Sequence, residues 1–376
     1  MVAAISVLSF IFTLCYVLFL LYFTSGWARL KRLPVQNRQF KTAVSILIAA
    51  RDEEDNIAKT IDDLLKQTYP SALTEIIIVD DHSTDRTADI VRSYGDRGVK
   101  LLQMQESELL NSYKKKAIAK AIDLAGGELI VCTDADCRMG SNWLADIVDY
   151  YEQSDKVMIS SPVSYFQESS FFEHLQTLEF SFLIGIGAAS IGHKKATTCN
   201  GANLAYRKDI FYAVGGFQGI DDVASGDDEL LLQKVAEKYP GKIGFLKSRN
   251  AIVYTHAKHT LQSFLNQRRR WASKSTKYKD KRVVALAVLI WLFNVTLLIN
   301  TVGAFFTPVF TRIALTQFLF KLVFEVAFLL PVLGFFRRVR LISLAFILSP
   351  VHVLYLVYVG VAGNTGKYQW KGRMVR

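Results

Sequence analysis

The sequence predicts an α/β domain with a mostly parallel sheet, set between hydrophobic segments that can cross a membrane. In the middle of the chain, short apolar runs that end in acidic residues alternate with segments of helical periodicity. This alternation is typical of a parallel sheet with helices on both faces. Both ends of the chain carry long stretches without charged side chains, and a membrane helix needs about 20 such residues.

The first strand and helix of the central region have clear signals. The run VSILIAA at 44–50 predicts a buried strand, and Ile57, Ile61, Leu64 and Leu65 follow it at helical spacing. The same signals return further along the chain. They predict strands at 75–81, 100–104 and 128–136, with helices at 83–94 and 114–125.

The hydrophobic segments divide the chain of 376 residues into three parts. Residues 2–23 carry no charge and are followed by basic residues instead of a small-residue cleavage site, which favours an uncleaved anchor over a signal peptide. Three further apolar segments are expected as helices at 283–311, 313–336 and 341–366. We therefore expect an anchor at 1–32, a soluble domain at 33–282, and a helical block with a basic tail at 283–376.

Basic residues gather beside the hydrophobic segments and give the chain a net charge of +11. This pattern predicts an integral protein of the cell (inner) membrane with its soluble domain in the cytoplasm. Anionic lipid headgroups account for the charge, and no RNA or DNA motif is present. The basic tail at 367–376 disagrees with four spans, so the last segment is either re-entrant or interfacial, or breaks the rule. The four cysteines form no CxxC pair and indicate free thiols.

Acidic residues follow three of the predicted strands. Asp52–Glu54, Asp80–Asp81, and the pair Asp134 and Asp136 all fall where strands end, and ligands of such sheets bind beyond the carboxyl ends of the strands. The first cluster alone is equally well explained as a helix cap. Carboxylates gathered at one edge repel one another unless a cation or a donor-rich ligand balances them, which favours a divalent metal and a nucleotide.

Several motifs occur in order along the soluble domain. They are VDDHSTDRT (79–87), TDAD (133–136), CNGANLAYRK (199–208), GGF (215–217), GDDELLLQK (226–234) and QRRRW (267–271). With this set the chain resembles the family 2 glycosyltransferases of the GT-A fold, and QRRRW fits the QxxRW signature of that family. The resemblance covers essentially the whole soluble domain.

The resemblance implies roles for residues near the strand ends. It places Ala50, Arg51, Glu53, Asp80 and Asp81 in a nucleotide pocket, although the family usually has Asn where this chain has Asp52. Lys114 matches a lysine near the pyrophosphate. The adjacent Lys115 and Lys116 are at least as well explained as a solvated helix face.

The two acidic pairs have different implied roles. Asp134 and Asp136 match the metal-binding pair, for which Mg²⁺ and Mn²⁺ are both suited. Asp228 matches the general base that takes a proton from the acceptor hydroxyl, and Asp227 binds the acceptor or holds the pair in place. Asp227 and Asp228 can also cap the helix that follows, and capping is compatible with catalysis.

The remaining predictions concern helices. Gln267, Arg270 and Trp271 are implied to lie beside the active site, whereas 259–271 also has the pattern of a basic amphipathic helix on a membrane. The apolar residues of 169–183 fit either a second such helix or core packing. Lys321 and Glu325 are four residues apart in an apolar segment, which indicates a self-neutralising pair or a surface for a lipid acceptor or for translocation.

The implied function is a membrane-bound inverting glycosyltransferase that uses a nucleotide-sugar, most simply a UDP-sugar, and a lipid or lipid-linked acceptor at the cytoplasmic face. The main alternative is a processive polysaccharide synthase that takes a glycan acceptor. A transporter with a nucleotide-binding domain and a catalytically inactive sugar-nucleotide sensor are less consistent with the complete set of acidic residues.

Overall fold

The computed structural model describes residues 2–31, 39–105, 112–223, 225–274, 278, 280–362, 368–370 and 373–375. The chain forms two compact units. The helical unit comprises Met1–Arg29, Ser169–Ala189 and Lys258–Gly366. The α/β unit comprises Leu30–Glu168, Ser190–Ala257 and Lys367–Arg376. This grouping differs from the division of the sequence at 33 and 282, because two internal segments pack with the terminal helices.

The α/β unit contains a seven-stranded sheet in its described residues, in the order β3-β2-β1-β4-β8-β6-β9. Its strands are β1 (Val44–Ala50), β2 (Thr74–Asp80), β3 (Val99–Gln103), β4 (Leu129–Cys132), β6 (Met158–Ser160), β8 (Leu204–Arg207) and β9 (Ile243–Phe245). The strands β1 to β4 pair in parallel, whereas β8 is antiparallel to both of its neighbours. The predicted α/β class and mostly parallel sheet are confirmed.

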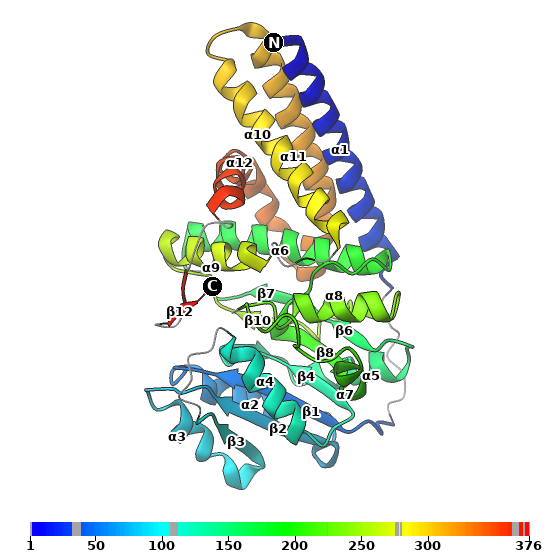
Figure 1. Ribbon diagram of the computed structural model, residues 1–376, viewed down its shortest axis with the longest axis vertical. Helices are drawn as coiled ribbons and strands as arrows, with labels where there is room; N and C mark the ends of the chain where they lie inside the picture. Colours follow the sequence, from blue (N-terminus) through cyan, green and yellow to red (C-terminus); the bar gives the residue numbers. More distant parts are fainter. Residues whose placement is uncertain are drawn as a thin grey trace. The chain divides into compact units, whose positions relative to one another are not determined.

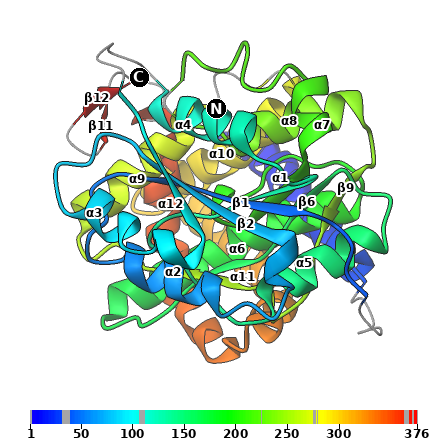
Figure 2. The same ribbon diagram turned by 90° about the horizontal axis from the view of Figure 1, so that it is seen from below.

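A smaller sheet has the order β5-β10-β7. Its strands are β5 (Arg138–Met139), β7 (Val163–Tyr165) and β10 (Val253–Thr255). The helices of the unit are α2 (Ile57–Leu65), α3 (Thr87–Arg92), α4 (Tyr113–Leu124), α5 (Trp143–Glu152), α7 (Lys208–Ala213) and α8 (Glu229–Lys238). Figure 2 shows α4 on one side of β1 and β2, with α2 on the other.

One predicted strand is shorter than expected, and the difference matters for the site. The strand predicted at 128–136 ends at Cys132. All four of its residues are buried, whereas Asp134 and Asp136 are half-buried and lie in the turn that follows. An ionised carboxylate is costly to bury without a partner, so the strand stops where the acidic residues begin.

The helical unit contains α1 (Val2–Arg29), α6 (Phe171–Gly192), α9 (Leu261–Ser273), α10 (Lys281–Gly303), α11 (Pro308–Phe336) and α12 (Ala345–Ala362), of which the last three residues of α6 belong to the other unit. The helices α1, α10 and α11 lie side by side (Figure 1). Within the described residues, five helices are long and apolar enough to cross a membrane. They are Val2–Arg29, Phe171–Gly192, Val283–Gly303, Pro308–Phe336 and Val339–Val361.

Four of these helices were expected from the sequence, and Phe171–Gly192 is the additional one. In the most apolar stretch of Phe171–Gly192, 67% is buried inside the protein, whereas the corresponding share in the other four helices is 17–39%. Leu178 is fully buried and packs against Leu329 and Leu333 of α11. Core packing therefore accounts for most of this helix, while Phe171 at its start is 54% exposed.

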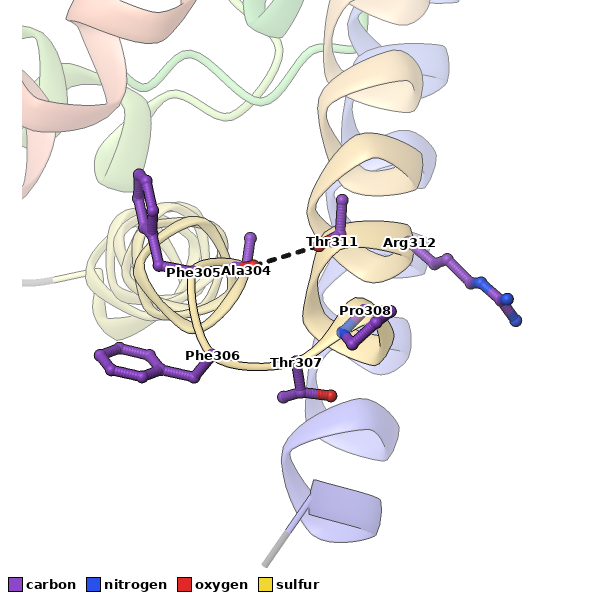
Figure 3. Close-up of a pocket in the computed structure, with 7 residues that line it drawn as sticks. All are labelled: Ala304, Phe305, Phe306, Thr307, Pro308, Thr311 and Arg312. Atoms are coloured by element: carbon purple, nitrogen blue, oxygen red, sulfur yellow. Dashed lines mark hydrogen bonds between the residues drawn. The ribbon is translucent and has the colours of Figure 1, made fainter.

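The connection between α10 and α11 falls earlier than predicted. The segment expected at 283–311 ends at Gly303, and Arg312 lies inside the next helix. The side chain of Thr307 accepts a hydrogen bond from the backbone of Val309, and Pro308 occupies the first turn, a position that suits proline. A cavity of about 370 Å³ lies at this connection, lined by Ala304–Pro308, Thr311 and Arg312 (Figure 3).

The predicted pair of Lys321 and Glu325 forms inside α11. Nζ of Lys321 lies 2.5 Å from Oε1 of Glu325, and the hydroxyl of Tyr16 in α1 donates to the same oxygen at 2.5 Å. Lys321 is completely buried. The ionic group is therefore satisfied within the bundle of α1 and α11.

Part of the predicted basic clusters lies outside the described residues, namely residues 32, 275–277, 279, 367, 371, 372 and 376. The described part of the tail forms an antiparallel pair of strands, β11 (Tyr368–Trp370) and β12 (Arg373–Val375). All four cysteines are free, as predicted.

Candidate active site

Lys114, in the first turn of α4, connects the two predicted acidic pairs. Its Nζ lies 2.7 Å from Oδ1 of Asp134 and 3.1 Å from Oδ2 of Asp227. Burial by itself would lower the pKa of Lys114, but the carboxylates of Asp134 and Asp227 outweigh burial and hold that pKa well above its usual value. The two carboxylates thus favour the charged form of the ammonium group, which joins two motifs that are far apart in the chain.

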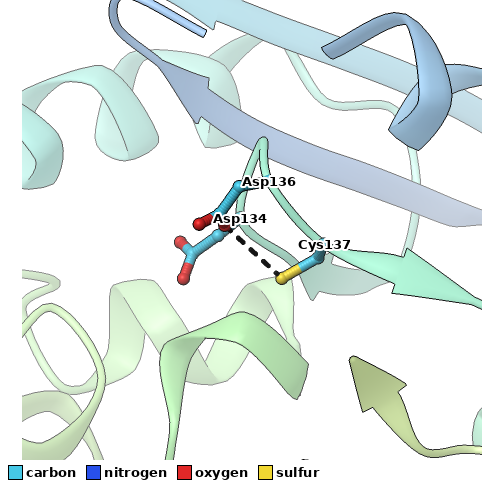
Figure 4. A group of neighbouring side chains, drawn as sticks. All are labelled: Asp134, Asp136 and Cys137. Carbon is cyan, nitrogen blue, oxygen red and sulfur yellow. Dashed lines mark hydrogen bonds between the residues drawn. The ribbon is translucent and has the colours of Figure 1, made fainter. Parts of the chain in front are cut away.

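The predicted metal pair lies in the turn after β4. Ligand atoms of Asp134, Asp136 and Cys137 lie within 4.8 Å of one another (Figure 4). The hydroxyl of Thr255 in β10 lies 3.4 Å from Oδ2 of Asp136 as a donor. Thr255 carries no signal in the sequence motifs, because only the pairing of β10 beside β5 brings it here.

The donor set fits a hard divalent cation held by the two carboxylates. Burial and then the charge of Asp136 raise the pKa of the Cys137 thiol well above its ordinary value. Only the deprotonated thiolate is a good metal ligand, so Cys137 is the unsuited member of the group. Carboxylate oxygens are the ligands that Mg²⁺ and Mn²⁺ prefer, and Asp134 and Asp136 supply them.

Asp228 is the N-cap of α8. Its Oδ1 accepts a hydrogen bond from the backbone N–H of Glu229 at 2.6 Å, and its Oδ2 accepts one from the N–H of Gly201 at 3.0 Å. The predicted capping role is confirmed for Asp228. A carboxylate has about four acceptor positions, so two backbone bonds fix its orientation and still leave capacity to accept a proton.

Gly201 is a site residue that the sequence reasoning did not single out. A Cβ atom at this position would lie 3.3 Å from Cβ of Asp228 and 3.4 Å from Oδ2 of Asp227. Both contacts are tight, so glycine is what lets the backbone N–H approach the acidic pair. The motif CNGANLAYRK contained the signal, since a glycine beside a strand often marks a close backbone approach.

The loops after β1 and β2 are tied together by acidic side chains. Oδ1 of Asp52 accepts from the backbone N–H of Thr84 at 2.8 Å, and Oε2 of Glu54 accepts from that of Arg86 at 3.0 Å. The alternative that this cluster caps α2 is wrong, because α2 starts at Ile57 with Asn56 as its N-cap. These carboxylates are satisfied by the neighbouring loop.

The other predicted nucleotide residues lie at the same strand ends. The backbone N–H of Asp81 donates to the carbonyl of Ala50 at 2.8 Å, and Nη1 of Arg51 donates to the carbonyl of Asp81 at 3.0 Å. Glu53 lies in the same loop, where its Oε2 accepts from the side-chain amide of Asn56 at 3.3 Å. Asp80 is buried, and its Oδ1 accepts from the backbone N–H of Ser83 at 3.2 Å.

A ring contact connects these strand ends to α4. Nδ1 of His82 lies 2.9 Å from Oδ1 of Asp81, and the His82 ring packs edge-on against Tyr113 with centroids 6.4 Å apart. Tyr113 directly precedes Lys114. The ends of β1 and β2, the start of α4 and the turn after β4 therefore form one continuous set of contacts.

The QRRRW motif lies in α9, within the helical unit. Its buried residue is Arg268, which the sequence reasoning did not single out: Nη2 lies 2.6 Å from Oε2 of Glu179 in α6. Nη1 of Arg268 donates to Oε1 of Gln267 at 2.6 Å, and its guanidinium lies 4.3 Å from the centroid of the Trp271 ring. The expected position of Gln267, Arg270 and Trp271 beside the active site stays a prediction.

Residues 45–215 match the family model described as Glycosyl transferase family 2. This part of the chain belongs to that family. The match to the family 2 domain runs from β1 to α7 and includes Asp134, Asp136 and Gly201. The match ends before the acidic pair at 227 and 228. The structure nevertheless brings this pair next to the family 2 domain, because Asp227 contacts Lys114.

Two curated relatives illustrate the similarity. Over 110 residues the chain is 34% identical to the beta-monoglucosyldiacylglycerol synthase of Nostoc sp., a match that covers 29% of this chain and 24% of the relative. Over 235 residues it is 23% identical to the poly-beta-1,6-N-acetyl-D-glucosamine synthase of Staphylococcus epidermidis, covering 61% of this chain and 53% of the relative. The matches thus span a quarter to about half of these relatives.

Among solved structures, the mannosyltransferase PcManGT from Pyrobaculum calidifontis, in complex with GDP-Man and Mn²⁺, has the same fold. The superposition has a TM-score of 0.62 at 17% sequence identity, and it covers 94% of this chain and 99% of that one. The likeness therefore extends over both the family 2 domain and the terminal helices. The predicted GT-A fold class is confirmed.

Proposed function

We propose that this protein is an inverting glycosyltransferase that moves a sugar from a nucleotide-sugar to a lipid or lipid-linked acceptor at the membrane surface. The observation that carries the proposal is the position of Lys114 between Asp134 and Asp227. This contact brings a metal-binding carboxylate pair and a candidate base pair within one side chain of each other. A cation site next to a proton acceptor suits the transfer of a sugar from a nucleotide-sugar, with a nucleoside diphosphate as the leaving group.

Asp228 is assigned as the general base. A sugar or lipid hydroxyl is a weak nucleophile at neutral pH, and a positioned carboxylate that accepts its proton contributes about 10² to 10⁴ in rate. The backbone N–H groups of Gly201 and Glu229 hold the Asp228 carboxylate from two sides, which supports this role. Attack on the sugar from the face opposite the leaving group inverts the anomeric centre. Asp227, held by Lys114, positions the pair.

Asp134 and Asp136 would hold a divalent cation, Mg²⁺ or Mn²⁺. Such a cation stabilises the negative charge that develops on a departing nucleoside diphosphate. Lys114 lies beside this position and supplies further positive charge next to the diphosphate. Ala50, Arg51, Glu53, Asp80 and Asp81 would line the nucleotide pocket. The family resemblance implies Gln267, Arg270 and Trp271 beside the active site, with the Arg270 guanidinium near the diphosphate and the Trp271 indole as a platform for the acceptor.

The donor is proposed as a UDP-sugar on the family resemblance, and GDP-mannose is the second donor to test because the solved structure of the same fold holds GDP-Man. A lipid acceptor is supported by the similarity to a beta-monoglucosyldiacylglycerol synthase and by the apolar helices of the chain. The α/β unit is proposed to face the cytoplasm, because basic residues lie beside the apolar segments.

The second candidate function is polymer synthesis. It is favoured by the match to the poly-N-acetylglucosamine synthase, which covers a larger share of this chain than the diacylglycerol enzyme does. The size of the product separates the two. A ladder of long chains would support the polymer function, and a single glycolipid would support single transfer.

The proposal is tested with the full-length chain in lipid nanodiscs, supplied with UDP-sugars or GDP-mannose, Mn²⁺ and membrane lipid extract. We expect metal-dependent release of nucleoside diphosphate together with a sugar-containing lipid. The variant Asp228→Asn should lose about 10² to 10⁴ in transfer rate while its affinity for UDP stays close to that of the wild type. The matched control Asp221→Asn removes an exposed acid of the preceding loop and should retain transfer. Comparable transfer by Asp228→Asn would show that the base is assigned incorrectly.

A further inference from the structure

Lys115 directly follows Lys114 in α4, but it has a different environment. Only 1% of its surface is exposed, so the solvated-face alternative is wrong for this residue. Consecutive residues of a helix point about 100° apart, and the two ammonium groups therefore reach different neighbours. Nζ of Lys115 donates to the backbone carbonyls of residues 220, 223 and 225 at 2.5, 2.6 and 2.8 Å.

These carbonyls belong to the connection between α7 and α8, which forms neither helix nor strand in its described residues. Buried backbone carbonyls need a hydrogen-bond partner, and no strand ladder supplies one here. The three protons of the Lys115 ammonium group match the three carbonyls. Ser112 adds a hydroxyl that donates to the carbonyl of Asp221. The start of α4 thus holds the described residues 220–223 and 225, which we name the anchored segment.

The anchored segment leads directly into the acidic pair. Ser225, whose carbonyl accepts from Lys115, is followed by Gly226 and then by Asp227. Gly226 has a φ of +85°, a conformation that favours glycine. Lys114 holds the carboxylate of Asp227. Two adjacent lysines of α4 therefore hold this region. Lys115 fixes the backbone that precedes the acidic pair, and Lys114 fixes the carboxylate of Asp227.

We propose that Lys115 is a positioning residue for sugar transfer: by holding the anchored segment, it sets where Asp227 and Asp228 stand relative to Asp134. The proposal rests on the proposed function of Asp228 as the base. The residues proposed to bind the nucleotide lie at the strand ends and not in the anchored segment. Loss of the Lys115 ammonium group should therefore affect turnover and leave donor binding nearly unchanged.

The test uses Lys115→Met, which keeps an unbranched side chain one heavy atom shorter than lysine and removes its donors, in the full-length chain in nanodiscs. We expect kcat for the sugar donor that the wild type uses to fall at least 30-fold. The KM for that donor and the Kd for UDP with Mn²⁺ should change less than threefold. Amide hydrogen exchange of residues 226–230 should accelerate at least tenfold. If Lys115→Met does not fold, Lys115→Gln keeps two of the donors and replaces it.

Two control variants separate positioning from a general loss of structure. Nζ of Lys234 donates to the carbonyls of Gly216 and Gln218 at 2.6 and 2.8 Å, so Lys234→Met releases the earlier part of the same connection. Lys116→Met removes the next lysine of α4. Both controls should keep kcat within threefold of the wild type.

The outcomes distinguish this inference from the proposed function. A Lys115 variant with kcat within threefold of the wild type, or with unchanged exchange at 226–230, would overturn the positioning role while Asp228→Asn still tests the base. A wild-type protein without transfer from any of the donors would overturn the proposed function and, with it, the catalytic part of this inference. An equal loss of kcat in Lys234→Met would reduce the role of Lys115 to general stability.

Discussion

Lys114 and Asp227 form an ion pair across the α/β unit, with Nζ of the lysine 3.1 Å from Oδ2 of the aspartate. The same ammonium group lies 2.7 Å from Oδ1 of Asp134. A single cation therefore balances one carboxylate from each acidic motif. Without it, the two carboxylates would repel one another across the site where the diphosphate is proposed to bind.

The first prediction concerns this cation. Lys114→Met should lower kcat/KM for the donor by about 10- to 100-fold, because a hydrogen bond to a charged group contributes about 1.5–3 kcal/mol. The Kd for UDP should rise as well, since positive charge beside the phosphates is lost. Steady-state kinetics and UDP titration measure both effects, and Lys116→Met is the matched control. Unchanged UDP affinity in Lys114→Met would contradict the placement of the diphosphate.

The second prediction concerns Gly201. The variant Gly201→Ala keeps the backbone N–H that binds Asp228 but adds a Cβ 3.3 Å from Cβ of Asp228. The acidic pair must then shift by a few tenths of an ångström, and a small displacement of a catalytic group costs turnover. We expect kcat to fall about tenfold or more, with a melting temperature close to that of the wild type.

A matched control for Gly201→Ala is Gly95→Ala. A Cβ at Gly95 meets no atom within 4 Å, so this variant should keep full activity. If Gly201→Ala also retained full activity, the close approach of the backbone to Asp228 would have no catalytic consequence.

The third prediction separates the metal ligands from their neighbour. Asp136→Asn should weaken Mn²⁺ binding by at least about tenfold, since it removes an anionic oxygen that a hard cation prefers. Cys137→Ser should bind Mn²⁺ like the wild type, because burial and Asp136 keep the thiol pKa high and the thiol protonated. Electron paramagnetic resonance of Mn²⁺ titrated into each protein measures the affinities. Loss of binding in Cys137→Ser would make the thiol a ligand.

The fourth prediction concerns the helical unit. Arg268 and Glu179 are 2% and 5% exposed, and their ion pair closes α9 onto α6. Removing one member of a buried pair costs about 3–5 kcal/mol, because the other charge is left without a partner. Arg268→Met should therefore lower the melting temperature strongly, and adding Glu179→Gln should recover part of the loss.

The less buried Arg269 provides the control for that experiment. Arg269→Met should melt close to the wild type. Equal melting temperatures for Arg268→Met and Arg269→Met would show that the buried pair does not stabilise the helical unit.

The fifth prediction is a pH dependence from Lys115. Burial lowers the pKa of Lys115 to about 8, although the carboxylates of Asp227, Asp222, Asp228 and Asp221 oppose the change. Above that pH the neutral amine has two protons for three carbonyls, so kcat should fall with an apparent pKa near 8. The effect of Lys115 on the free energy of unfolding changes with pH in the opposite direction to its effect on kcat. Its folded pKa lies below the unfolded value, so its contribution to stability rises between pH 8 and about 10.4.

Profiles of kcat against pH for the wild type and Lys115→Met test this prediction. The descending limb near pH 8 should be present in the wild type and absent from the variant. The same limb in both proteins would assign it to another group.

The sequence by itself determined the class of the fold and the candidate residues. The strands at 44–50, 75–81 and 100–104 were predicted to within one residue at each end, because alternating apolar runs and helical periods are encoded in neighbouring residues. The acidic motifs were equally visible. The exact end of β4 was not, because the burial of Asp134 and Asp136 depends on the whole sheet.

The tertiary structure alone decided which of these residues touch. Lys114 and Lys115 are neighbours in one helix, and no local pattern predicts that one contacts two carboxylates and the other three backbone carbonyls. The contacts of Gly201, Thr255 and Arg268 were likewise identified only in the structure. Contacts between residues far apart in the chain follow from how strands and helices pack, and no local pattern records that packing.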